Sequence, residues 1–214
     1  MKSNTKPEIS SISINLMEVA IDSIFKDGIL RDIPFVSTLF SIGKMSKTVT
    51  DTLLLNRIIC FIEELDFKNI DQIEEFKERY FKNDNYQKIG SRVLLSLEKA
   101  DDETKIKWIA RSFRIFINKE IDKGIFLRLS SIINGAFVSD VEKIVIFNDK
   151  ESIVSNDQEV ESYVLDHLFS IGLLENIGTD GGSSFDRNNG GIIYRLNIFG
   201  EVMLNKILTA PETN

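Results

Sequence analysis

The chain has few of the residues on which metal sites and nucleophilic catalysis depend. Its 214 residues include one histidine, His167, and one cysteine, Cys60. A structural zinc site takes about four nitrogen or sulfur ligands, so these two residues cannot supply one. A Ser–His or Cys–His pair would have to use His167, which we interpret as a helix-surface residue. We therefore predict no catalytic residue, no metal, no cofactor and no enzymatic activity.

Prolines and long apolar runs are also scarce. The nearest candidate for a membrane span, residues 33–55, is interrupted by Lys44, Lys47 and Asp51, whereas a span needs about 20 apolar residues. The N-terminus leads into an amphipathic segment and not into an apolar signal-peptide region. The single cysteine fits a reducing compartment. We expect a cytoplasmic protein without a transmembrane segment, in which the apolar stretch Ile29–Met45 is a buried core helix or docks on a partner or membrane. The three prolines leave room for long helices; they are Pro7, Pro34 and Pro211.

Positive charge is rare in the last quarter of the chain. The formal net charge is −7, and residues 157–214 hold three basic side chains against nine acidic ones. Such a balance argues against non-specific binding of nucleic acid. The basic residues of this part are Arg187, Arg195 and Lys206.

Apolar residues at helical spacing dominate the first two thirds of the chain. The helix expected over residues 46–66 is apolar nearly all round between Leu53 and Ile62, which is typical of the central helix of a bundle. Asp101, Asp102 and Glu103 are placed to begin another helix. We predict a helical bundle domain over residues 1–147. Residues 139–147 fit a short helix or a strand, and the polar segment 148–156 is interpreted as a linker. The clearest amphipathic pattern consists of Ile106, Ile109, Ala110, Phe113, Phe116 and Ile117.

The segment after the linker changes character. Ser155 with Gln158, or Asn156 with Glu159, has the spacing of a capping box for a helix that ends at Gly172. A glycine-rich loop follows and lacks the Lys-Ser/Thr ending of a phosphate-binding loop, so we interpret it as a hairpin turn. The fold class is therefore mainly α, a multi-helix bundle followed by a small α+β module at residues 156–214.

Four basic residues are the candidate binding site. Lys107, Arg111 and Arg114 recur at i, i+4 and i+7, opposite the apolar stripe of their helix, and Arg187 lies at the expected hairpin tip. Such a stripe suits phosphate, an anionic membrane or an acidic partner. The alternative is a solvated helix face with salt bridges to acidic neighbours.

Parts of the chain resemble a group of small uncharacterised bacterial proteins. The resemblance rests on Asp32-Ile33-Pro34-Phe35-Val36, on Leu53-Leu54-Leu55-Asn56-Arg57-Ile58 and on Leu94-Leu95-Ser96-Leu97-Glu98. The helical part is also similar to tellurite-resistance B-like bundles, although their acidic metal motif is absent. The run Tyr194-Arg195-Leu196-Asn197-Ile198-Phe199-Gly200 resembles the end of winged-helix modules, with Asn197 in place of the usual threonine. The resemblance implies a bacterial or phage-related setting and no defined activity.

Two functions compete. The first is a non-enzymatic interaction or regulatory protein, in a bacterial stress or phage-defence setting, that binds a protein partner or associates with itself. The alternative is a DNA-binding transcriptional regulator acting through the winged-helix-like module. DNA reading needs base-contacting side chains on the recognition helix. The helix before Gly172 contains no lysine or arginine, so we favour the protein partner.

Overall fold

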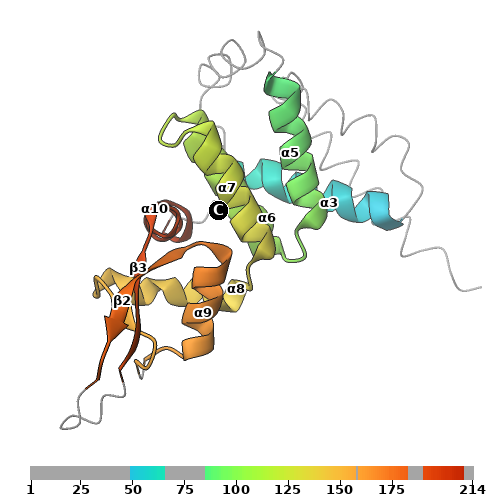
Figure 1. The fold of residues 1–214 in the computed structure, drawn as a ribbon. Helices are drawn as coiled ribbons and strands as arrows, with labels where there is room; N and C mark the ends of the chain where they lie inside the picture. The colour runs from blue at the N-terminus through green and yellow to red at the C-terminus, as the bar shows by residue number, and fades with distance from the viewer. Residues whose placement is uncertain (1–48, 66–84, 158, 183–189, 210–214) are drawn as a thin grey trace, which may run out of the picture. The chain divides into compact units, whose positions relative to one another are not determined.

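The computed structural model describes residues 49–65, 85–157, 159–182 and 190–209. The chain divides into two compact units, Met1–Glu98 and Lys99–Asn214 (Figure 1). The predicted linker therefore lies inside the second unit, and the domain bounds 1–147 and 156–214 stay a prediction. The predicted helices before residue 46, the apolar stretch Ile29–Met45 and the charged helix at residues 71–80 lie outside the described residues.

The described part of the first unit consists of two helices, α3 (Val49–Leu65) and α5 (Asn85–Lys99). Arg57 of α3 donates from Nη1 to the carbonyl of Glu98 at 2.7 Å, so α3 satisfies a carbonyl in the last turn of α5. Leu53 is 50% exposed and Cys60 is half-buried. The sequence-based expectation that α3 is buried on every face is therefore wrong. The buried side chains of the two helices are those of Leu55, Ile58, Phe61, Ile62, Leu65, Ile89, Val93 and Leu97.

The second unit is mainly helical and carries a small sheet. Its elements in chain order are α6 (Glu103–Ile117), α7 (Lys123–Gly135), α8 (Val138–Glu142), the 3₁₀-helix η2 (Lys143–Asn148), β1 (Ile153–Val154), α9 (Ser162–Ile171), β2 (Leu174–Asp180), β3 (Gly191–Leu196), α10 (Ile198–Val202) and the π-helix η3 (Met203–Leu208).

Helix α6 is the central helix of this unit, because α7 and η3 pack on it. It begins where the acidic run predicts: Asp102 is the N-cap, and its Oδ1 accepts from the Thr104 amide at 2.7 Å. The rings of Phe116 and Phe126 stack at a centroid distance of 5.1 Å. Trp108 is 3% exposed, so it belongs to the core and is not a surface contact residue.

The sheet is antiparallel with the order β1-β3-β2. The predicted hairpin is confirmed, because Leu174 pairs with Leu196 and Asp180 with Gly191. The predicted linker contains a strand instead: Ile153 pairs with Tyr194 in β3. The residues that were expected to be polar and unpaired are thus part of the fold.

Neither predicted capping box forms. Helix α9 begins later, at Ser162, with Glu161 at the N-cap and no side-chain cap. Ser155 Oγ instead accepts from the Ile192 amide at 3.0 Å, and Asn156 donates from its side chain to the Gly190 carbonyl. Both side chains are used to join the end of β1 to β3, because that edge of the sheet offers them backbone partners.

One glycine and one asparagine fix the turns on either side of the hairpin. Gly172 ends α9 with φ at +91°, a left-handed conformation that favours glycine. Asn197 accepts from the amides of Phe199 and Gly200 at 2.9 and 3.1 Å and so caps α10. Its Nδ2 donates to the carbonyls of Gly172 and Leu174 at 3.0 and 3.2 Å. Asn197 therefore ties the end of β3 to the start of β2.

Candidate functional site

The basic residues predicted as a binding stripe do not share one exposed face. Lys107 pairs with Glu103 at 2.9 Å, one turn earlier on α6. Arg111 is 6% exposed and donates from Nη1 to the Ile207 carbonyl at 2.9 Å. Arg114 is half-buried, and Arg187 lies outside the described residues. Arg111 is buried because its side chain meets η3, which the periodicity of α6 alone did not indicate. A binding role for the four residues stays a prediction.

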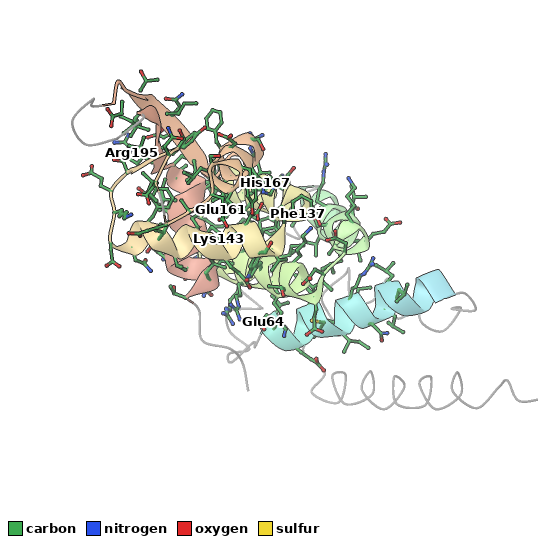
Figure 2. The ribbon with its side chains drawn as sticks, turned by 90° about the horizontal axis from the view of Figure 1, so that it is seen from below. Glu64, Phe137, Lys143, Glu161, His167 and Arg195 are labelled. Carbon is green, nitrogen blue, oxygen red and sulfur yellow. The ribbon has the colours of Figure 1, made fainter. Side chains whose placement is uncertain are left out.

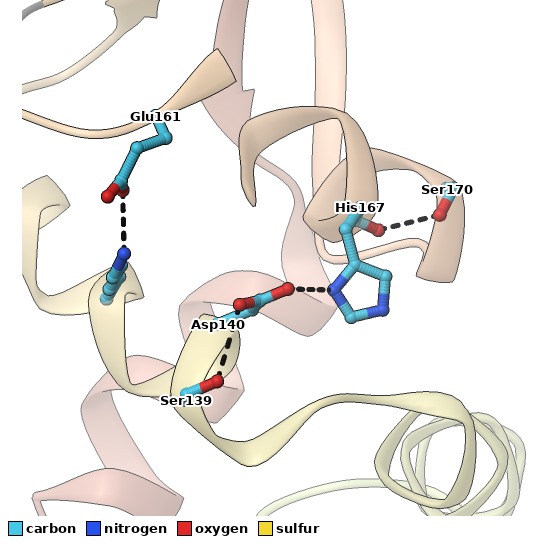
Figure 3. Close-up of polar contacts among 6 residues, drawn as sticks. Ser139, Asp140, Glu161, His167 and Ser170 are labelled. Carbon is cyan, nitrogen blue, oxygen red and sulfur yellow. Dashed lines mark hydrogen bonds and ion pairs between the residues drawn. The ribbon is translucent and has the colours of Figure 1, made fainter. Parts of the chain in front are cut away.

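The single histidine is held by a carboxylate. His167 in α9 was expected on the helix surface, but its side chain is only 18% exposed, and its Nδ1 lies 2.7 Å from Asp140 Oδ2 in α8 (Figure 3). The ring of Phe137 meets the imidazole edge-on at a centroid distance of 5.3 Å. Helices α8 and α9 pack side by side, and this contact fixes the orientation of the ring.

A second polar pair joins the same two segments. Lys143 Nζ lies 2.6 Å from Glu161 Oε2, at the start of α9 (Figure 3). The hydrogen bond to Glu161 raises the pKa of Lys143, and the same bond lowers the pKa of Glu161. Figure 2 shows Phe137, Lys143, Glu161 and His167 gathered over one part of the second unit.

We name this region the α8–α9 surface and define it by six residues. Two of them are aromatic and exposed: Phe137 is 70% exposed and Tyr163 is 62% exposed. No other large apolar side chain among the described residues is as exposed as these two. Aromatic side chains are enriched at interaction sites compared with the rest of the protein surface. The members of the α8–α9 surface are Phe137, Asp140, Lys143, Glu161, Tyr163 and His167.

The chemistry of this surface suits binding better than covalent catalysis. A nucleophile would have to lie within hydrogen-bond reach of the imidazole. Ser170 Oγ instead donates to the backbone carbonyl of His167 at 2.8 Å, and Ser139 Oγ donates to Asp140 Oδ1 at 3.5 Å. In the part of the chain that the structure describes, no group of three or more histidine, cysteine or acidic residues is placed to hold a metal ion.

The opposite side of α9 is anchored to the hairpin. Tyr194 of β3 is 2% exposed, and its hydroxyl donates to Asp166 Oδ1 at 2.7 Å. Burial, together with this hydrogen bond, raises the pKa of Tyr194 to about 12. On the outer face of the hairpin, Arg195 pairs with Glu175 at 2.5 Å, and this bond raises the pKa of Arg195. Helix α9 is thus held on one side by β3 and on the other by α8.

Sequence reasoning missed the Asp140–His167 contact. The two residues are 27 positions apart, and their helices meet only through the packing of the second unit. The available signal was the pair of residue types: a lone histidine in an apolar helix needs a polar partner when it is partly buried. The sequence offered many carboxylates and no means of choosing between them.

Comparisons of this chain with protein-family models, with curated proteins and with solved structures found no match. Among the described residues, no single helix is long and apolar enough to cross a membrane. Two consecutive helical segments, Lys123–Gly135 and Val138–Asn148, together have the length and composition of a membrane span, but the chain bends by 119° between them. Core burial accounts for the apolar character of this pair, since its buried residues include Phe126, Leu129 and Ile144.

Proposed function

We propose that the second unit is a non-enzymatic protein-interaction module and that α9 is its main contact element. The observation that carries this proposal is the pair of exposed aromatic rings on the α8–α9 surface. The Phe137 ring packs on His167, and Tyr163 lies one helical turn before that histidine. Aromatic residues are enriched at the buried centres of protein interfaces. Tyr163 lies in the first turn of α9, and Phe137 is the N-cap residue of α8 with its ring against His167, so a partner would meet a largely preorganised surface.

We also propose that this module is winged-helix-like. The strand order β1-β3-β2 and the helix α9 directly before the β2–β3 hairpin support the assignment. In such an arrangement α9 corresponds to the recognition helix and the hairpin to the wing. The proposed contact element, α9, would therefore occupy the position of the recognition helix in a winged-helix module.

The charges favour a protein partner over DNA. Helix α9 contains no lysine or arginine, and its exposed residues include Asp166. Lys143 and Arg195, two basic residues of the neighbouring elements, each form an ion pair with a glutamate. Affinity for DNA depends mainly on phosphate contacts from unpaired basic side chains.

The test is a selection of random 12-residue peptides displayed on phage against the immobilised full chain. The selected peptides are then titrated against the double variant Phe137→Ala/Tyr163→Ala. The matched control is Ile198→Ala, which removes a side chain that is 54% exposed on α10, away from the surface. Circular dichroism verifies that each variant is folded.

Selected peptides should lose about tenfold or more in affinity for the double variant and bind Ile198→Ala as they bind the unmodified chain, since two interface aromatics together contribute more than about 1.4 kcal/mol. Peptides that bind all three proteins equally would overturn the proposal. Tight binding of a labelled 30-bp duplex, falling steeply between about 50 and 200 mM salt, would favour the DNA-binding regulator instead.

A further inference from the structure

We infer that the α8–α9 surface binds an arginine-bearing segment of a partner protein, a specificity that rests on the interaction function proposed above. Three features of the described residues carry the inference: a local excess of carboxylates, two exposed aromatic rings, and a histidine whose second ring nitrogen faces away from its carboxylate partner. Each one suits a guanidinium group.

The charge around the surface is negative. Helix α8, η2 and the N-cap of α9 carry three carboxylates and one ammonium group, a balance of −2 with His167 neutral. The one ammonium group, that of Lys143, is already paired with Glu161. Glu142 is exposed. A cationic segment would be steered towards this region and an acidic one repelled. The three carboxylates are those of Asp140, Glu142 and Glu161.

The exposed rings supply a second reason to expect a cation. The faces of aromatic rings carry partial negative charge and attract cations placed over them. Phe137 and Tyr163 are 70% and 62% exposed, so each ring has a face open to a ligand. Arginine stacks on such faces better than lysine, because its guanidinium is planar and more weakly hydrated.

His167 supplies a hydrogen-bond acceptor for a guanidinium N–H. Its Nδ1 lies 2.7 Å from the Asp140 carboxylate, which accepts and does not donate, so Nδ1 carries the proton. In the neutral ring the other nitrogen, Nε2, is then an acceptor. Nε2 lies on the side of the ring away from Asp140 in Figure 3. A guanidinium that stacks on Phe137 is close enough to the adjoining imidazole to donate an N–H to this atom.

The experiment uses three fluorescein-labelled 12-residue peptides that differ only at four positions, which hold arginine, lysine or glutamate between glycine and serine residues. Fluorescence anisotropy measures their affinity for the full chain at 50 and 200 mM salt. We expect the arginine peptide to bind most tightly and the glutamate peptide not to bind.

Variants separate stacking from general attraction to an acidic protein. Phe137→Leu keeps an apolar side chain but removes the ring, and Tyr163→Leu does the same; each should weaken the arginine peptide about two- to fivefold. His167→Phe keeps a ring but removes the acceptor and should reduce the preference for arginine over lysine. Ile198→Ala should leave all affinities unchanged.

Equal affinity for the arginine and lysine peptides, or variants that bind the arginine peptide like the unmodified chain, would overturn the inference. The failure of the inference is distinct from that of the proposed function. If phage selection yields peptides that need Phe137 and Tyr163 but contain no arginine, the interaction function stands and the arginine specificity falls. If no selected peptide needs these rings, the proposed function fails as well.

Discussion

Replacing Arg111 by methionine tests whether this arginine holds the second unit together. Its side chain is 6% exposed on α6, and its Nη1 donates to the carbonyl of Ile207 at 2.9 Å. Ile207 lies in the last turn of η3, where carbonyls lack partners within the helix and carry partial negative charge. Methionine keeps an unbranched apolar stem but removes the charged donor, so the Ile207 carbonyl loses this partner.

The expected loss follows from the kind of bond. A hydrogen bond from a charged group contributes about 1.5–3 kcal/mol, and leaving a buried acceptor unsatisfied costs a similar amount. We therefore expect Arg111→Met to lower the free energy of unfolding of the second unit by about 2 kcal/mol. For a unit of this size, that corresponds to a decrease in Tm of about 10 °C.

Urea unfolding followed by tryptophan fluorescence is the assay. Trp108 is the one tryptophan of the chain and is buried in α6, so its emission reports the second unit. Arg128→Met is the matched control, because Arg128 is an exposed residue on α7 and its loss should change stability by less than about 0.5 kcal/mol. If Arg111→Met were as mild as the control, the contact between α6 and η3 would not depend on Arg111.

Three further predictions concern α9 and the hairpin. The neutral form of Tyr194 is favoured in the folded state, so its contribution to stability is complete below about pH 10 and is lost as the pH rises towards about 12. The ultraviolet titration of the unmodified chain minus that of Tyr194→Phe should show a tyrosine with a midpoint near 12. A midpoint near 10 would contradict this reasoning. A Cβ at Gly200 would lie 2.2 Å from the Leu173 carbonyl oxygen, so Gly200→Ala should destabilise the unit by about 1–3 kcal/mol in urea unfolding. An unchanged unfolding midpoint would mean that the turn can move to accommodate the methyl group. Gly172→Ala, at φ +91°, should cost about 1 kcal/mol and should be milder than Gly200→Ala, because no atom lies within 3.4 Å of its added Cβ; the reverse order would refute the steric argument.

Local signals in the sequence predicted local structure well. The acidic run before α6, the glycine after α9 and the glycine-rich loop each gave a boundary that the structure has, because caps and turns depend on neighbouring residues. The capping residues predicted before α9 were wrong, although Ser155–Gln158 and Asn156–Glu159 have the spacing that a capping box requires. Ser155 and Asn156 bond to β3, and no spacing rule indicates that a strand 30 or more residues later competes for them.

The candidate site could not be predicted from the sequence, because it too depends on contacts between segments that are far apart in the chain. The periodicity of α6 assigned Arg111 to the face opposite its apolar stripe, but η3 packs on α6 and buries this side chain. The Asp140–His167 pair depends on how α8 packs against α9. Charge reversal of Lys107, Arg111 and Arg114 together is for this reason a poor test of a binding stripe, since a glutamate at position 111 would repel the carbonyl of Ile207 and destabilise the fold.

The bond between Arg111 and Ile207 spans 96 residues and so makes the completion of the second unit a late event in synthesis. While a ribosome is still adding the residues after β3, α6 has α7 to pack on but lacks the six residues of η3, Met203–Leu208, that cover its other face. A nascent chain of this length exposes the apolar residues that η3 later buries, and such intermediates are prone to aggregate or to be cleaved. Long-range closure also slows folding relative to a bundle held by local contacts. A truncation between Leu196 and Met203 would therefore stop the unit at this open stage, even though the sheet, α9 and the Asp140–His167 pair would all be present in the remaining chain.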